Sequence, residues 1–164
     1  MAKSTIILGT VFGLLLAMAV IFWAGGTLSA ELAVSAATGA EHPGAWASIA
    51  GIVSGGAAPQ YFGEPLPADP AACRMEDVNL VLRNHGLLDA EWLSVKVDGG
   101  PGDIAVYSIT GEGGAVPALG QFDLNLKLVS SISATRQRVY RVQYYVYGMK
   151  REITVSQSGD GQTQ

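Results

Sequence analysis

Residues 121–128 read QFDLNLKL, and this stretch decides the fold. Apolar residues occupy every second position, and polar or charged residues occupy the positions between them. A strand with one buried face and one wet face has this period of two. The same alternation runs through residues 78–82 and 93–97, so we expect at least three strands to share one buried layer.

Three further strands are predicted around this layer. Residues 104–110 lie between two glycine-rich turns, and residues 139–147 and 150–156 flank a predicted two-residue turn, Gly148-Met149. Residues 48–54 are a possible seventh strand. Short strands with no helical period between them predict a β-sandwich. About 86 residues is small for seven strands, so one edge is expected to be open or completed by a neighbour.

The composition excludes several classes of function and of binding site. Of the 164 residues, 49% are hydrophobic and 15% are charged, and the net charge is −4. This acidity argues against a nucleic-acid-binding protein, which needs a basic surface. The single cysteine, Cys73, excludes an internal disulfide and a cysteine-cluster metal site. The sequence contains no recognisable catalytic triad, carboxylate pair or phosphate loop, so we expect no catalytic residue, cofactor or metal.

The uncharged stretch from Thr5 to Ala24 predicts a transmembrane helix. Twenty helical residues span about 30 Å, the thickness of the hydrocarbon core. Lys3 precedes the stretch and no positive charge follows until Arg74. The positive-inside tendency therefore predicts a single-pass protein with a cytoplasmic N-terminus and an extracytoplasmic or cell-surface domain.

The helix is expected to continue beyond the membrane to about Gly39. Leu28, Leu32 and Ala36 recur at helical spacing, and Pro43 ends the pattern. A flexible Ala/Gly linker explains the same residues equally well. A helix that stays apolar outside the bilayer packs against copies of itself. The candidate contacts of this helix are Leu14, Phe22, Trp23, Leu28 and Leu32.

The sequence thus predicts four regions. Residues 1–40 form the transmembrane helix and its extension, and residues 41–72 form an Ala/Gly/Pro-rich spacer. Residues 73–158 form the sandwich, and residues 159–164 form a polar tail. A cleaved signal peptide ending at Ala30 is an alternative reading of the first region, and it would release a secreted binding module.

The segment from Val78 to Gly99 resembles extracytoplasmic immunoglobulin-like adhesion modules. One strand ends in Asn84-His85-Gly86, another follows at once, and Ala118-Leu119-Gly120 forms a Leu-x-Gly-type turn before a later strand. Asn84 and Gly86 tolerate the left-handed turn that we expect there. The resemblance implies an all-β immunoglobulin-like sandwich preceded by one long N-terminal transmembrane α-helix.

The same architecture resembles archaeal type IV pilin-like and archaellum-type proteins. The leader Met1–Ser4 is similar to their short leaders, which would place a cut between Ser4 and Thr5. Gly9 stands where bacterial-type pilins carry a glutamate, which disfavours the bacterial version. The resemblance implies a non-enzymatic structural subunit of a surface filament, with the helix in its core and the sandwich outside.

A membrane-anchored accessory subunit that docks its sandwich onto a larger membrane complex is the alternative function. The expected partners are copies of the chain itself or other complex subunits, together with the lipid bilayer. Four tyrosines of residues 139–147, with Trp92, suggest a contact surface. Tyr140 and Tyr144 share one face of their strand. We assign this pair as the outward-facing subunit contact.

Three other groups of side chains have the chemistry for a site or a protective edge. Cys73, Met75 and His85 offer soft ligands for copper, but a structural role suits them better. Asp98, Asp103 and Glu112 lie near glycine-rich turns that could hold calcium, although acidic turns are common. A basic cluster is expected to form a solvated edge that discourages strand pairing. Its members are Arg136, Arg138, Arg141, Lys150 and Arg151.

Overall fold

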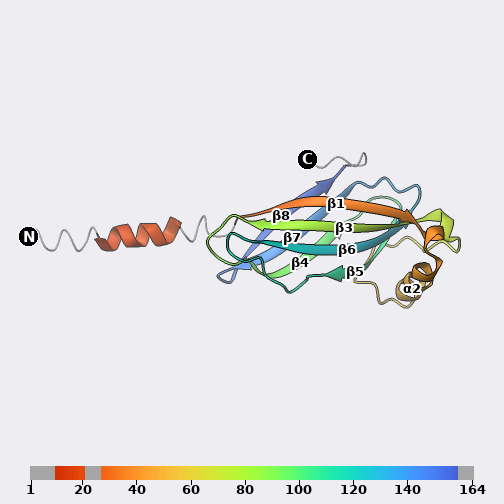
Figure 1. Ribbon diagram of the computed structural model, residues 1–164, viewed down its shortest axis with the longest axis horizontal. Helices are drawn as coiled ribbons and strands as arrows, with labels where there is room; N and C mark the ends of the chain where they lie inside the picture. Colours follow the sequence, from red (N-terminus) through yellow and green to blue (C-terminus); the bar gives the residue numbers. More distant parts are fainter. Residues whose placement is uncertain (1–9, 21–26, 159–164) are drawn as a thin grey trace, which may run out of the picture.

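The computed structural model describes residues 10–20 and 27–158. Residues 10–20 are helical, and residues 27–158 fold as a sandwich of two antiparallel sheets (Figure 1). The β-sandwich that the sequence predicts is therefore confirmed.

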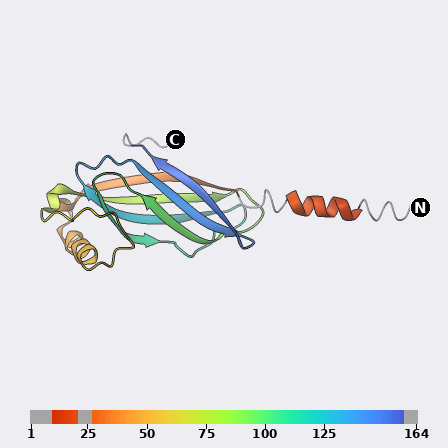
Figure 2. The same cartoon turned by 180° about the vertical axis from the view of Figure 1, so that it is seen from behind.

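The five-stranded sheet has the order β1-β3-β6-β5-β2, and the three-stranded sheet has the order β4-β7-β8. Apart from β2, this is the strand order of constant-type immunoglobulin domains. Figure 2 shows the molecule from the side of the three-stranded sheet. The strands are β1 (Leu28–Thr38), β2 (Gln60–Tyr61), β3 (Cys73–Asn84), β4 (Glu91–Asp98), β5 (Asp103–Thr110), β6 (Gln121–Ser131), β7 (Arg138–Val146) and β8 (Met149–Gln157).

The main core lies between the two sheets and follows the alternation seen in the sequence. Leu80 of β3, Leu126 of β6 and Val142 of β7 are fully buried, and their chain neighbours on both sides are more exposed. Fully burying a side chain of this size stabilises a fold by about 1.5–3 kcal/mol.

A second, smaller core lies on the outer face of the five-stranded sheet. Helix α2 (Pro43–Ser54) covers that face at one end and packs Ile49 against Met75 and Val129. The expected seventh strand at residues 48–54 is therefore wrong. Pro43, which we expected to end a helix, begins this one, because proline suits the first helical turn, where the missing N–H needs no partner.

The expected helical extension to Gly39 is also wrong. Residues 28–38 form β1, which pairs with β3 over its whole length. Leu28 is buried in the main core and Leu32 packs against it. A spacing of four residues fits a strand as well as a helix, since four is a multiple of the strand period of two. The polar residues between the apolar ones favour the strand. The sandwich accordingly begins at Leu28 rather than at Cys73.

The membrane prediction is corrected as well. Within residues 10–20 and 27–158, no helix is long and apolar enough to cross a membrane. The long transmembrane helix, and the single-pass localisation built on it, are therefore overturned. Residues 10–20 of the predicted span are helical, whereas the leader, Phe22 and Trp23 lie outside the described residues.

Candidate protein-contact surface

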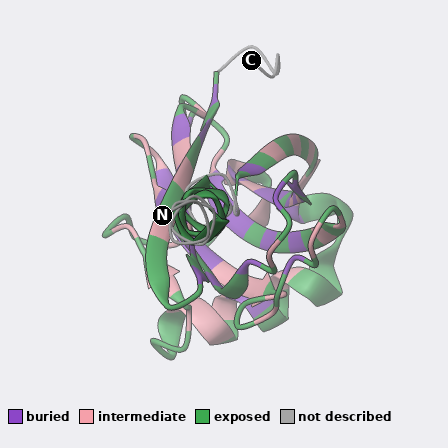
Figure 3. Cartoon of the chain, turned by 90° about the vertical axis from the view of Figure 1, so that its left-hand side faces the viewer, coloured by how far each residue is buried: buried purple, intermediate pink, exposed green. Residues whose placement is uncertain are grey.

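Exposed apolar side chains gather at the end of the sandwich opposite α2. We call Leu87, Trp92, Leu119 and Tyr147 the loop-end surface. Trp92, Leu119 and Tyr147 are each 69% exposed, and Leu87 is 63% exposed. Figure 3 looks onto this end of the molecule.

Hydrogen bonds between loops hold this surface together. The Leu119 N–H donates to the Gly86 carbonyl at 3.1 Å, next to Leu87, and the Ala118 N–H donates to Asp89 Oδ1 at 2.8 Å. Leu87 and Tyr147 also line one hollow, together with Glu91. The loop after β3, the loop before β6 and the β7–β8 turn therefore meet at one end.

Asn84 fixes the loop after β3 by a mechanism other than the expected left-handed turn. Its side-chain amide donates to the Leu88 and Val116 carbonyls at 2.7 and 3.2 Å, and its Oδ1 accepts from the Gly86 N–H at 2.9 Å. Neither Asn84 nor Gly86 has a positive φ. The asparagine is needed for its hydrogen-bonding capacity. Because Asn84 is buried, leaving any of these groups unpaired would destabilise the fold.

Three residues of the surface have left-handed backbones. The φ angles of Trp92, Leu119 and Tyr147 are 55°, 55° and 51°. Trp92 lies in the irregularity where the β4–β7 register shifts between Glu91 and Ser94. Tyr147 and Gly148, both with positive φ, form the β7–β8 turn, so the expected Gly148-Met149 turn is displaced by one residue. A positive φ on a bulky residue is costly, and such strain concentrates at functional sites.

The tyrosines that we expected to form the outward contact pair are the inward pair. Tyr140 is 0% exposed and Tyr144 is 3% exposed, and both lie in the main core. Burial raises the pKa of Tyr140 to about 12, and its hydroxyl donates to Gln157 Oε1 at 2.8 Å. Tyr145 and Tyr147 face outward instead.

The helix contacts predicted from the sequence are dispersed. Leu14 is 64% exposed in the described helix, whereas Leu28 and Leu32 belong to β1 and face the core. Phe22 and Trp23 lie outside the described residues.

The basic cluster does not form one solvated edge: Arg138 is fully buried, whereas Lys150 is exposed on the edge strand β8. Its Nε donates to Asp103 Oδ2 at 2.8 Å, and its Nη1 donates to Glu76 Oε2. Burial alone would lower the pKa of Arg138, but the hydrogen bonds to Asp103 and Glu76 raise it. Arg136 Nε lies 3.3 Å from Glu76 Oε1, so two cations balance two carboxylates.

The two candidate metal sets are not assembled. Cys73 and Met75 lie beneath α2, while His85 follows the far end of β3 and bonds to Ser29 Oγ at 2.8 Å. The three acidic side chains are engaged separately, by Arg141, Arg138 and the Val95 N–H. These carboxylates are Asp98, Asp103 and Glu112. In the described part of the chain, no group of three acidic, His or Cys side chains could hold a metal.

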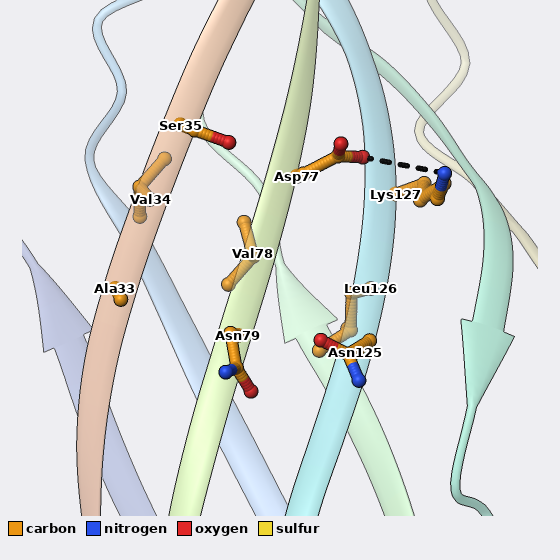
Figure 4. A pocket seen from close by; sticks show the side chains of 9 residues that line it. All are labelled: Ala33, Val34, Ser35, Asp77, Val78, Asn79, Asn125, Leu126 and Lys127. Atoms are coloured by element: carbon orange, nitrogen blue, oxygen red, sulfur yellow. Dashed lines mark ion pairs between the residues drawn. The ribbon is translucent and has the colours of Figure 1, made fainter.

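A shallow hollow of about 330 Å³ lies on the outer face of β1, β3 and β6 (Figure 4). Its polar side chains include Asn79, Asn125 and the ion pair between Lys127 Nζ and Asp77 Oδ1, 3.8 Å apart. An adjoining hollow reaches Tyr107, whose pKa is raised to about 12 by burial and then by Asp77. Lys127 and Asp77 pair with each other, whereas Asn79 Oδ1 is buried without a hydrogen-bond partner in the described part of the chain. This face is the polar outer side of the sheet.

Of the loop-end surface, Trp92 is predicted from the sequence as an aromatic contact residue, whereas Leu87 and Leu119 are not. The available signal for Leu119 was a large apolar residue between Pro117 and Gly120, in a stretch that turn residues predict to be a loop. A positive φ on a leucine cannot be read from sequence, because the tertiary structure imposes it.

Comparisons with known proteins show no family for this chain. No model of a protein family matches it, and no curated protein matches it.

Several solved structures have a remote likeness to the chain. The yeast GGA1 GAE domain–P21 structure is 14% identical, with a TM-score of 0.40 over 57% of this chain and 94% of that one. The GAE domain of GGA2p from Saccharomyces cerevisiae is 8% identical, with a TM-score of 0.39 over 60% and 94%. A FixG-related protein from Vibrio parahaemolyticus is 11% identical, with a TM-score of 0.34 over 77% and 93%. At these scores the likenesses carry no argument about function, and the loop-end surface has to be interpreted from its own geometry.

Proposed function

We propose that the protein is a non-enzymatic interaction subunit whose sandwich docks onto a protein partner through the loop-end surface. One observation carries the proposal: Trp92, Leu119 and Tyr147 are bulky, exposed and held with a positive φ. Tryptophan and tyrosine are the residue types most enriched among dominant interface contacts. Backbone strain of this kind clusters at binding and other functional sites.

The surroundings of the surface support a protein partner. Asp89 and Glu91 line the same hollow as Leu87 and Tyr147. Lys150 stands opposite Tyr145 across the β7–β8 pair. An apolar centre with charged residues at its border is the usual anatomy of a specific protein interface.

The N-terminal helix supports the assignment to an assembly. Residues 10–20 expose large apolar side chains around the helix, including Phe12, Leu14 and Leu16. A helix that is apolar on all sides is stable only when other apolar groups cover it. We therefore assign the chain to a larger assembly rather than to a free-standing domain.

Site-specific photo-crosslinking in the native host cell tests the proposal. A photoreactive amino acid at Leu119 should give a discrete protein adduct. The matched position is Lys96, which is exposed on the outer face of β4, and the same probe there should give little or none. Equal adduct formation at both positions, or none at Leu119, would contradict the proposal.

A surface filament built from copies of the chain is a second candidate, which the exposed apolar helix favours. Leu14→Glu should then abolish assembly while the circular dichroism of the sandwich stays unchanged, because Leu14 is exposed in the single chain. Normal filaments from this variant would rule the candidate out.

A further inference from the structure

The sandwich has four edges, and three of them are protected against pairing with another strand. Edge strands carry unpaired N–H and C=O groups, which proteins normally cover, bulge or flank with charge. Hydrogen bonds to neighbouring residues occupy the outward-facing backbone N–H groups of β4. The N–H groups of Leu93, Val95 and Val97 donate to the Gly114 carbonyl, Glu112 Oε1 and Gln60 Oε1 at 3.1, 3.0 and 3.1 Å.

The β5 and β8 edges are protected in other ways. β5 is partly covered by β2, and its register with β6 shifts twice, between Asp103 and Ala105 and between Val106 and Ser108. β8 carries the consecutive charges Lys150, Arg151 and Glu152. Charges and irregularities of this kind are the common means of discouraging edge pairing.

The edge of β1 is flanked by β8 only at its beginning, where Leu28–Ala30 line a hollow together with residues 153–156. The eleven residues of β1 pair with β3 without a register shift, and they include no proline and no lysine. The one charge, Glu31, is held by Arg83 at 3.4 Å. A long, regularly paired and nearly uncharged edge is a template for strand addition.

The register shows which backbone groups of β1 are available. The Thr27 carbonyl accepts from the His85 N–H at 3.0 Å, so 27 and 85 form a hydrogen-bonded pair. Such pairs alternate along antiparallel strands. The odd-numbered residues of β1 therefore bond to β3, and the even-numbered residues direct their N–H and C=O groups to the free edge. Within residues 27–158, these groups have no backbone partner.

We propose that a second copy of this chain occupies the edge, with the two β1 strands antiparallel about a two-fold axis at Ala33. In this register even-numbered residues face even-numbered residues, so the free backbone groups of both strands pair. Leu32 faces Val34 on the core side, where both are half-buried and gain a neighbour. Each Glu31 faces Ser35 on the outer side, so the two carboxylates stay apart. Figure 4 shows Ala33 and Ser35 on β1, with β3 beside it.

The self-pairing is independent of the loop-end surface, and cysteine cross-linking of the full chain tests it. Ala33 would face its own copy in a non-hydrogen-bonded pair, about 4.5 Å between Cα atoms. That separation permits a disulfide. Ala33→Cys should therefore give a disulfide-linked dimer under mild oxidation.

Ala37→Cys is the matched control on the same strand. Ala37 would lie eight residues from its copy, roughly 27 Å away, so this variant should stay uncrosslinked. The native Cys73 is buried and common to both variants. Cross-linking of both variants, of neither, or of Ala37→Cys alone would overturn the proposal. Association through residues 10–20 or through a foreign strand gives no selective Ala33 product and overturns it too.

A charge variant provides a second test by sedimentation equilibrium. Ala33→Lys would place two ammonium groups face to face and should weaken self-association several-fold. Gln121→Lys adds the same charge to the exposed outer face of β6 and should leave self-association unchanged. Equal dimerisation of the two variants would overturn the self-pairing.

Discussion

Trp92, Leu119 and Tyr147 place large side chains where the backbone favours glycine or asparagine. A left-handed conformation costs an ordinary residue about 1–2 kcal/mol. Their side chains are mostly exposed to solvent. Such strain is expected if these side chains contact a partner outside the chain. A substitution that removes the strain should then raise the stability of the fold and weaken partner binding.

Tyr147→Asn is the simplest such change. It creates an Asn-Gly turn, the preferred sequence when both central residues have a positive φ. The free energy of unfolding in urea should rise by about 1 kcal/mol, while any partner contact at the loop-end surface is lost. Tyr145→Asn, on the regular part of β7, is the control and should give no gain. A loss of stability at position 147 equal to that at 145 would argue against strain.

Arg138 and Arg141 are near neighbours on β7 with opposite surroundings. Arg138→Met leaves Glu76 and Asp103 buried without their main cation, and it should destabilise the fold by about 3–5 kcal/mol. Arg141 is 47% exposed beside Asp98, and Arg141→Met should cost about 1 kcal/mol or less. Denaturant titration of both variants gives the comparison, and similar losses would contradict a structural role for the buried cluster.

At the scale of elements, period two predicted β3, β4 and β6 to β8 well, because these strands alternate between a buried and a more exposed face. β5, whose first four residues are all buried, is predicted from the glycine-rich turns on either side of it. The period of two did not identify β1, because small residues weaken the alternation of apolar and polar positions there. The Leu28–Leu32 spacing also fits a helix. The sequence pattern also failed for α2, because Pro43 can end one helix or begin another. The choice depended on Met75 and Val129, which are distant in sequence and offer α2 an apolar surface.

The hydrogen bonds between Gln60 and Val97 protect part of the β4 edge, and a substitution at Gln60 tests them. Gln60→Ala removes the side chain that bonds both the N–H and the C=O of Val97. Hydrogen exchange at the Val97 amide should accelerate, because the native partner of that N–H is gone. The Val95 amide, held by Glu112, should keep its exchange rate. Unchanged exchange at Val97 would mean that the Gln60 bond is not maintained in solution.

At the scale of the whole molecule, the sandwich depends on residues that the sequence analysis assigned to a helix and a spacer. β1 supplies one edge of the five-stranded sheet, and α2 covers the second core. A fragment of residues 27–158 should therefore fold cooperatively with a β-type circular dichroism spectrum. A fragment of residues 73–158 should lack a cooperative transition, and equal stability of the two would refute this dependence.

The candidate site was less predictable than the sandwich. Trp92 was noted for its residue type, since exposed aromatics are common interface residues. Leu87 and Leu119 depend on three loops that meet through long-range bonds such as that from the Leu119 N–H to the Gly86 carbonyl. No local pattern specifies that meeting.

The inward position of Tyr140 and Tyr144 did have a local signal. These tyrosines share their face of β7 with Val142, whereas Arg141 and Gln143 lie on the other face.

The polarity of β1 has a consequence for binding strength. Because β1 begins beside His85, the chain enters the sandwich at the same end as the loop-end surface. The seven peptide steps from Val20 to Thr27 can separate the helix from the sandwich by about 25 Å at most. A partner that binds the apolar helix would thus have the loop-end surface nearby, at a high effective concentration for a second contact. Two contacts that are weak alone would then act as one avid attachment, and loss of either would release both.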